Sequence, residues 1–412
     1  MTNVRSRRGF QPQAWLWISL PFLSMLAGCA SADDGKVVPQ IVDARRDSGR
    51  RSIIAADGKT VAVAYAGPLE APDSGIYLAH SNDGGASFDP AKPVLVDAAH
   101  GIPKDLTVAG GSIYVTYQVV GDGGSYDIRV ASSDDGGETF AIQSVANGLG
   151  PALLVSGTTL YLAYNPQGQP EFGAPLFQRS DDRGQTWSPA AVISATATPG
   201  PISVNGLLDR TLSLGESGGN LYLSFFDGSS KTQKLAHSSD SGETWTVEAG
   251  QNLLATGSLV AVGDDVVLPM VDAQNRSFTC QSHDHGATWT AHPFDVAGGA
   301  YGNYPVDDIL DTDVAGPHLV GAGSRLYAIF NQPSIKDHPI AVGFARSDDQ
   351  GATWPAASVA TVFASDSWFT ANPTEGAQIV VSSAPVPALL TTTFDGTHLR
   401  VLRSTDDGAS WR

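Results

Sequence analysis

The hydrophobic pattern along the chain is one of short apolar runs separated by turn residues. The clearest stretch holds the runs Leu106 to Ala109, Ser112 to Gln118, Tyr126 to Ser132 and Ala141 to Val145, with the turn Gly110-Gly111 after the first. Runs of this length, rich in Val, Ile, Tyr and Thr and bounded by Gly, are typical of β-strands. We call them strands A, B, C and D, and the sequence predicts that they form one antiparallel four-stranded unit.

Tight glycine turns between strands A and B recur in the other units. Loops of two or three residues that contain Gly favour hairpins, because Gly adopts the positive φ that such turns need. They occur at Asp57-Gly58, Ser156-Gly157, Gly218-Gly219, Gly263-Asp264 and Gly321 to Gly323. Repetition of one such unit predicts an all-β chain.

An eight-residue motif follows strand C in every unit. It reads S-x-D-x-G-x-[TS]-[WF] and occurs at residues 81–88, 133–140, 180–187, 238–245, 282–289, 347–354 and 404–411. Its invariant carboxylates are Asp83, Asp135, Asp182, Asp240, Asp284, Asp349 and Asp406. An Asp here can accept hydrogen bonds from turn amides, and the closing aromatic suits the layer between two sheets. We therefore interpret these Asp residues as structural and not as catalytic.

The motif resembles the Asp box, or BNR repeat, of the sialidase superfamily and of other β-propellers such as the sortilin type. Successive Asp residues are about 54 positions apart on average, which suits one four-stranded antiparallel blade per motif. The seven motifs predict a seven-bladed β-propeller in a single domain, residues 37–412. Six blades plus an irregular element are the alternative, since sialidases have six.

Closure of the ring is predicted from the two ends of this domain. The last unit has no strand D after its motif. Val37 to Asp43, however, resembles Lys92 to Asp97, the strand that follows the first motif. Pairing of this N-terminal strand with the seventh strand C would close the ring and cover an exposed sheet edge.

The start of the chain predicts a lipid anchor. A basic beginning and the apolar run Ala14 to Leu26 are typical of a signal peptide, and the run is too short to span a bilayer. It ends in Leu26-Ala27-Gly28-Cys29, which resembles the lipobox of bacterial lipoproteins. That resemblance implies a signal peptide at 1–28, and a lipidated Cys29 with its tether at 29–36. An ordinary buried thiol at Cys29 is the alternative.

Charge and composition limit the partners. The chain has 42 acidic and 24 basic residues, a formal net charge of −18, whereas nucleic-acid binding needs a basic surface. We expect no nucleic-acid partner, a monomer, and attachment to the membrane through acyl chains instead of charge. Because Ala30 follows the lipobox, the resemblance implies the outer membrane if the cell has one. Cys280 is expected to be a small buried strand residue.

The loops divide between two faces of the predicted domain. Antiparallel strands put the A–B turns and the Asp boxes on one face, and the B–C and D–A loops on the other. Function is expected on the second face, where the loops are long and variable. Its largest insertions are Ala195 to Gly215 and Val296 to Pro317, and the latter contains Tyr301 and Tyr304. Trp368 lies outside the boxes and is a candidate for stacking on a sugar, with core packing as the alternative.

Acidic residues in the second insertion suggest a metal ligand set. Asp308, Asp311 and Asp313 offer oxygen atoms at the close spacing that suits Ca²⁺. The glycine and the terminal Glu of an EF-hand loop are missing, so a solvated acidic loop is the alternative. No other cofactor is expected.

Sialidase chemistry would need cations that clamp a carboxylate, a Tyr nucleophile and an acid. The resemblance implies an Arg-Ile-Pro motif at the start of the first unit, but the chain reads Arg50-Arg51-Ser52-Ile53 there. Arg51, Arg210 and Arg276 are therefore candidates for ligand binding, with solvated surface arginines as the alternative, and no catalytic role is transferred to them.

Three functions are compatible with these observations. The leading hypothesis is a surface-anchored, non-catalytic lipoprotein that binds a glycan or a protein through its loop-rich face. A glycoside hydrolase of the exo-sialidase type is the first alternative, and a protein-assembly scaffold is the second. Resemblance of fold does not choose among them, because propellers carry many unrelated functions.

Overall fold

A computed structural model describes residues 39–412 of the chain. Within this range it does not describe residues 46–49, 69–73, 122–123, 168–173, 194–211, 228–229, 231, 252, 256, 263–264, 273–275, 297–316, 333–339, 366–377, 384–386 and 395–396. Residues 38–412 form one compact unit. The predicted signal peptide, Cys29 and the tether lie outside the described residues. No helix among the described residues is long and apolar enough to cross a membrane.

Antiparallel β-strands make up the described structure, apart from one 3-10 turn at Ala356–Ser358. They form six hydrogen-bonded sheets, and four of these have four strands. The first contains β2 (Arg50–Asp57), β3 (Thr60–Ala66), β4 (Ile76–Ser81) and β5 (Val94–Asp97). The second contains β13 (Ser213–Ser217), β14 (Asn220–Asp227), β15 (Thr232–Ser238) and β16 (Thr246–Val247). The third contains β22 (His318–Ala322), β23 (Arg325–Gln332), β24 (Ile340–Ser347) and β25 (Ala360–Ser365).

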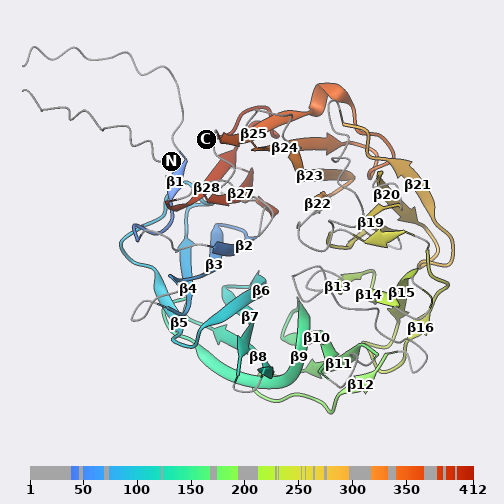
Figure 1. Cartoon of the computed structure of the whole chain (residues 1–412), viewed down its shortest axis with the longest axis horizontal. Coiled ribbons are helices and arrows are strands. Elements are labelled where there is room, and N and C mark those ends of the chain that lie inside the picture. The colour runs from blue at the N-terminus through green and yellow to red at the C-terminus, as the bar shows by residue number, and fades with distance from the viewer. Residues whose placement is uncertain are drawn as a thin grey trace, which may run out of the picture. The chain divides into compact units, whose positions relative to one another are not determined.

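The fourth sheet joins the two ends of the domain. Its strands are β26 (Ile379–Ser382), β27 (Ala388–Phe394), β28 (Leu399–Ser404) and β1 (Gln40–Ile41). A five-stranded sheet has an inner strand in two pieces, β17 (Leu254–Ala255) and β18 (Val260–Val262), followed by β19 (Asp265–Val271), β20 (Ser277–Ser282) and β21 (Thr290–Pro293). In Figure 1 the sheets radiate around a centre, with β2, β6, β13 and β22 on the inner side of their sheets and β1 on the outer side of its sheet.

The largest sheet has seven strands. They are β6 (Gly101–Ala109), β7 (Ser112–Val120), β8 (Tyr126–Ser133), β9 (Ala141–Ser156), β10 (Thr159–Pro166), β11 (Leu176–Ser180) and β12 (Ala191–Val192). Strand D was expected at Ala141 to Val145, separate from the strand A that leads into the turn at Ser156-Gly157, but β9 is one continuous strand of 16 residues that pairs with β8 first and with β10 afterwards. Gly148 permits this close passage, because a Cβ there would lie 2.5 Å from the carbonyl oxygen of Asn165.

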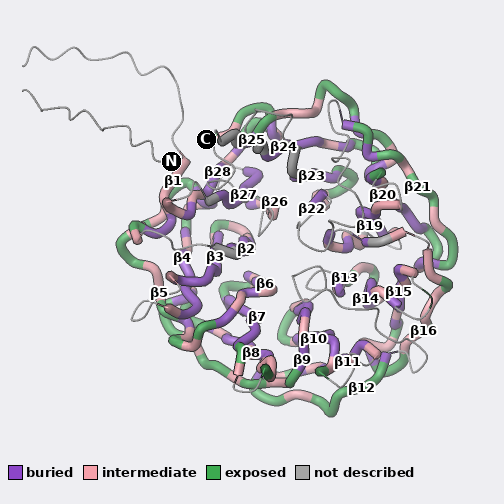
Figure 2. The backbone as a smooth tube through the Cα atoms, in the orientation of Figure 1, coloured by how far each residue is buried: buried purple, intermediate pink, exposed green. Residues whose placement is uncertain are grey.

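The hydrophobic core lies between neighbouring sheets. The described residues form seven buried clusters, each built from two four-stranded groups that follow one another along the chain, and the last cluster joins the C-terminal strands to the first sheet. Figure 2 shows the buried inner strands and the more exposed outer edge. Each cluster includes the aromatic residue of one Asp box: Phe88, Phe140, Trp187, Trp245, Trp289, Trp354 and Trp411. The cycle of sheet-on-sheet packing is that of a β-propeller.

The N-terminal strand pairs as the sequence predicts. In β1, Gln40 lies opposite Val401 and Ile41 opposite Arg400. Asp43 lies two residues after this strand, is fully buried, and accepts a hydrogen bond from the hydroxyl of Tyr65 (3.0 Å) in the next sheet. Asp97 ends β5 and likewise accepts from the hydroxyl of Tyr117 (2.7 Å). The resemblance between the two segments thus extends to the bonds that join one sheet to the next.

Each Asp box folds as a hydrogen-bonded turn around its carboxylate. In the third box, Ser180 Oγ donates to Asp182 Oδ1 (2.8 Å), and Thr186 donates its backbone N–H to the same oxygen (2.8 Å) and its hydroxyl to Oδ2 (2.6 Å). The corresponding side-chain bonds occur in the other six boxes. The bonds from Thr186 and Ser180 lower the pKa of Asp182 to about 2. These carboxylates are therefore occupied by the turn itself.

A polar belt joins the innermost strands. At four places around the ring, a side chain in an inner strand, or directly before it, accepts a backbone N–H from the next inner strand or from the residue before that strand. The pairs are Asp105 Oδ2 with Leu153 N (2.9 Å), Ser213 Oγ with Leu259 N (2.8 Å), His318 Nδ1 with Ile379 N (3.4 Å), and Gln378 Oε1 with Ile54 N (3.2 Å). Because these hydrogen bonds give each of the four backbone N–H groups an acceptor, they stabilise the inner part of the ring.

Candidate functional site

Most of the residues proposed from the sequence for ligand binding, metal binding or lipidation fall outside the described part of the chain. These are Cys29, Arg210, Tyr301, Tyr304, Asp308, Asp311, Asp313 and Trp368. The backbone of Arg51 lies in β2, but its side chain is not described. The described residues contain no cluster of three or more His, Cys, Asp or Glu that could hold a metal ion. The predicted calcium site lies in the part that is not described.

Arg276 lies in the loop between β19 and β20, on the loop-rich face. Its guanidinium binds Asp272 through Nε (2.6 Å) and through Nη2 (2.6 Å), and its backbone N–H donates to the same carboxylate (2.9 Å). The side chain is 70% exposed. This arginine therefore closes its own hairpin loop, and part of its hydrogen-bonding capacity is already used.

A pocket of about 570 Å³ lies on the opposite face, where the Asp boxes are. The hydrogen bonds Gly84 N to Lys59 O (2.8 Å) and Arg183 N to Thr158 O (3.1 Å) show that boxes and A–B turns share this face. The pocket is lined by the A–B turns of three successive four-stranded groups and by the third box: Ala56, Asp57, Val108, Ala109, Gly110, Ser112, Tyr114, Gly157, Thr158 and Arg183. Its volume is in the usual range of small-molecule sites.

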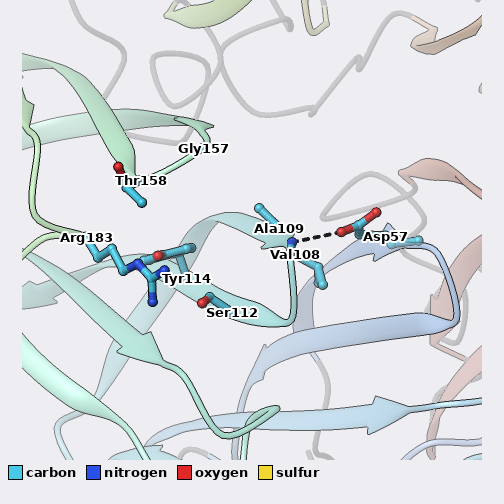
Figure 3. Close-up of a pocket in the computed structure, with 10 residues that line it drawn as sticks. Asp57, Val108, Ala109, Ser112, Tyr114, Gly157, Thr158 and Arg183 are labelled. Carbon is cyan, nitrogen blue, oxygen red and sulfur yellow. Dashed lines mark hydrogen bonds between the residues drawn. The ribbon is translucent and has the colours of Figure 1, made fainter.

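The pocket has a cationic end and an acidic end. Figure 3 shows Arg183 and Tyr114 at one end and Asp57 at the other, with Ser112 between them. Asp57 Oδ2 accepts the backbone N–H of Gly110 (2.9 Å), which joins the first A–B turn to the second. Its second oxygen has no hydrogen-bond partner among the described residues and is free to accept one from a ligand.

Arg183 is held at the edge of the pocket by its backbone. It is the fourth residue of its box and has a φ of 60°, in the left-handed region. Its side chain is 49% exposed, and its guanidinium contacts Asp134 Oδ1 through Nη1 at 3.4 Å. Asp134 in turn accepts the hydroxyl of Ser112 (2.6 Å). The remaining N–H groups of Arg183 have no acceptor among the described residues, so they are available to a ligand.

Tyr114 supplies the second unused polar group. Its residue is only 2% exposed, yet its hydroxyl has no hydrogen-bond partner in the described part of the chain. The same position of strand B behaves differently elsewhere. The hydroxyl of Tyr222 contacts His285 Nδ1 (2.8 Å), and the hydroxyl of Tyr327 donates to Asp407 Oδ1 (2.7 Å). In both cases the partner is the fourth residue of the next box. In the pocket, the corresponding residue is Arg183, which leaves the hydroxyl of Tyr114 unpaired.

Comparisons with known proteins agree with this architecture. The model of the BNR/Asp-box repeat matches residues 178–189, which contain the whole third box. The BP39L lectin from Burkholderia pseudomallei is similar in structure, with a TM-score of 0.58 and 11% identity, and the match covers 88% of this chain and 98% of that one. The fold is that of a β-propeller, and its third box matches the Asp-box repeat. At this identity the likeness extends to the fold alone.

Two further solved structures resemble the Asp-box propeller less closely. The Hadza microbial sialidase Hz136 has a TM-score of 0.45 and 18% identity, covering 84% of this chain and 73% of that one. The phage phi92 endosialidase has a TM-score of 0.49 and 10% identity, covering 89% and 68%. No curated protein matches the chain.

The pocket of the Asp-box propeller was not predicted from the sequence. The box face was expected to hold only short, uniform turns. The useful signal is the fourth position of the box, which carries Gly84, Gly136, Arg183, Ser241, His285, Gln350 and Asp407 in turn. Arginine occurs there once, and this variable position reaches the strand-B tyrosine of the preceding unit.

Proposed function

We propose that this propeller is a non-catalytic, glycan-binding protein of the bacterial cell envelope and that the box-face pocket holds the sugar. One observation carries the proposal: the Arg183 guanidinium and the Tyr114 hydroxyl line one pocket with unused hydrogen-bonding capacity. Both groups reach the open pocket, so a ligand can replace the water on them with hydrogen bonds of fixed geometry. Sugars offer hydroxyls that both donate and accept.

The composition of the pocket argues against hydrolysis there. Glycoside hydrolysis needs two carboxyl groups on either side of the scissile bond. Among the described lining residues, Asp57 is the one carboxylate, and one of its oxygens already holds the Gly110 amide. The exo-sialidase alternative on the loop-rich face is weakened by Arg276, whose guanidinium is bound to Asp272. A binding function is the better fit.

We further propose that the ring has seven blades. Support comes from seven Asp boxes in the sequence, seven inter-sheet clusters, and the division of the seven-stranded sheet into two four-stranded groups that share β9. A lectin of similar fold, matched over 98% of its length, supports a sugar-binding use of such a ring. The lipobox-like segment ending at Cys29 supports anchoring to the outer membrane.

A glycan array followed by calorimetric titration tests the binding function. We expect selective array binding by the wild-type protein and no turnover of a fluorogenic sialoside. Tyr114→Phe and Arg183→Ala should each weaken binding about tenfold, since each removes hydrogen bonds worth roughly 1 to 2 kcal/mol.

Tyr161→Phe is the matched control for this series. Tyr161 occupies the same position in the next unit, its hydroxyl also has no partner among the described residues, and it does not line the pocket. This variant should bind like wild type. Equal binding by Tyr114→Phe, Arg183→Ala and the wild type would remove the pocket from the proposal, and turnover of the sialoside would replace binding by catalysis.

A further inference from the structure

We infer that the box-face pocket takes a neutral sugar and discriminates against acidic sugars such as sialic or uronic acids. This inference rests on the proposed glycan binding and names its ligand class. It follows from the charges in and around the pocket and from the hydrogen-bonding groups that remain unused there.

The charge balance around the pocket disfavours a carboxylate. Arg183 is the one cation among its described lining residues, and its Nη1 already contacts Asp134 at 3.4 Å. Asp57 adds a second carboxylate at the far end of the pocket. Two negative charges thus accompany one positive charge, on a chain whose formal net charge is −18. An incoming carboxylate would share the guanidinium with Asp134 and would face Asp57.

The unused groups suit hydroxyls instead. Arg183 offers donors, the free oxygen of Asp57 offers an acceptor, and the Tyr114 hydroxyl can do either. The hydroxyl of Thr158, also in the lining, has no partner among the described residues. Sugar hydroxyls donate and accept at once, so one neutral ring can engage donors at one end of the pocket and an acceptor at the other. The carboxylate of an acidic sugar only accepts hydrogen bonds, so it cannot donate to Asp57 as a hydroxyl can.

Asp134 is the residue that determines this specificity. It does not line the pocket, but it accepts a hydrogen bond from the hydroxyl of Ser112 (2.6 Å) and lies beside the guanidinium of Arg183. A like charge about 4 Å away disfavours a bound carboxylate by on the order of 1 kcal/mol even in water, which is about fivefold in affinity. Removing the charge of Asp134 should therefore raise the affinity for acidic sugars about fivefold, while the affinity for neutral sugars changes little.

Binding of a defined sugar panel to the full-length protein tests the inference. The panel consists of the methyl glycosides of mannose, galactose and glucose, set against sialic acid and glucuronic acid, in 50 mM and 500 mM salt. We expect at least one neutral glycoside to bind at least about tenfold more tightly than either acid, with little dependence on salt, because screening acts on charges. Asp134→Asn should narrow that gap about fivefold, and the exposed Glu243→Gln should leave it unchanged.

The outcomes separate the two proposals. Tighter or equal binding of an acidic sugar by the wild-type protein, weakened by salt, would overturn the inference and leave glycan binding standing. No binding of any glycan on the array would overturn the proposed function and the inference with it. The wild-type comparison needs no variant, so a folding defect in Asp134→Asn would not decide the result.

Discussion

Asp105 gives a quantitative test of the polar belt on the inner strands. It follows a bulge in β6, and its two oxygens accept the backbone N–H groups of Leu153 (2.9 Å) and Leu106 (2.9 Å). Burial raises the pKa of this carboxyl to about 6, although both hydrogen bonds oppose the rise. The folded protein therefore binds this proton more tightly than the unfolded chain does, in which the pKa is near 3.8.

The direction of the pH effect follows from this raised pKa. The stabilisation is fully present below about pH 3.8 and is lost as the pH rises through about 6. A shift of this size corresponds to roughly 3 kcal/mol, since one pKa unit is worth about 1.4 kcal/mol. The side chain in Asp105→Asn cannot ionise, so the stability of this variant should not fall in this way as the pH rises. The free energy of unfolding of the wild type, relative to the variant, should fall by roughly 3 kcal/mol between about pH 3.5 and pH 7.

Urea unfolding at several pH values, followed by tryptophan fluorescence, measures this difference. Comparing wild type and variant at each pH cancels the other titrating groups. Glu243→Gln, at an exposed position of the fourth box, serves as the control and should show no such trend. A difference between wild type and Asp105→Asn that stays constant from pH 3.5 to 7 would refute the reasoning, because burial would then not penalise the ionised carboxyl.

Three further predictions test ring closure, box packing and a half-buried histidine. Val42→Asp, at a fully buried position after β1, should lower the melting temperature strongly by opening the closed ring, and an unchanged melting curve would contradict this. Gly242→Ala should destabilise by about 2 to 4 kcal/mol in chemical denaturation, since its Cβ would lie 2.3 Å from a ring carbon of Phe177. Gly58→Ala, at positive φ but in open space, should cost only about 1 kcal/mol, and equal costs for the two would refute the packing argument. Burial and a stacked neighbouring histidine lower the pKa of His237, so NMR titration should find it below 6.5, and a higher value would show that its ring is not desolvated.

The repeated parts of the fold were predictable because their signals are local. The S-x-D-x-G-x-[TS]-[WF] boxes, the glycine turns and the strand before each box all depend on residues a few positions apart. The pairing of β1 with β28 could be predicted because residues 37–43 repeat a strand already seen after the first box. The continuous β9 was missed, since strand D was expected to end near Val145, whereas Gly148 lets one extended chain pass from one group to the next.

The pocket depends on contacts that no local pattern shows. Tyr114 and Arg183 come from different units, and they share one cavity only because neighbouring sheets pack with their boxes on the same face. Which tyrosine hydroxyl stays unpaired is decided by the fourth residue of the following box. His285 and Asp407 pair with theirs, and Arg183 does not. Sequence reasoning had treated this position as a variable turn residue.

The most direct test of the central claim is a crystal structure of the protein with the sugar that binds best on the array. We predict electron density for the sugar in the box-face pocket, with hydroxyls within about 3.2 Å of the Arg183 guanidinium and of the Tyr114 hydroxyl. A sugar bound on the loop-rich face, with the box-face pocket holding only water, would contradict the claim.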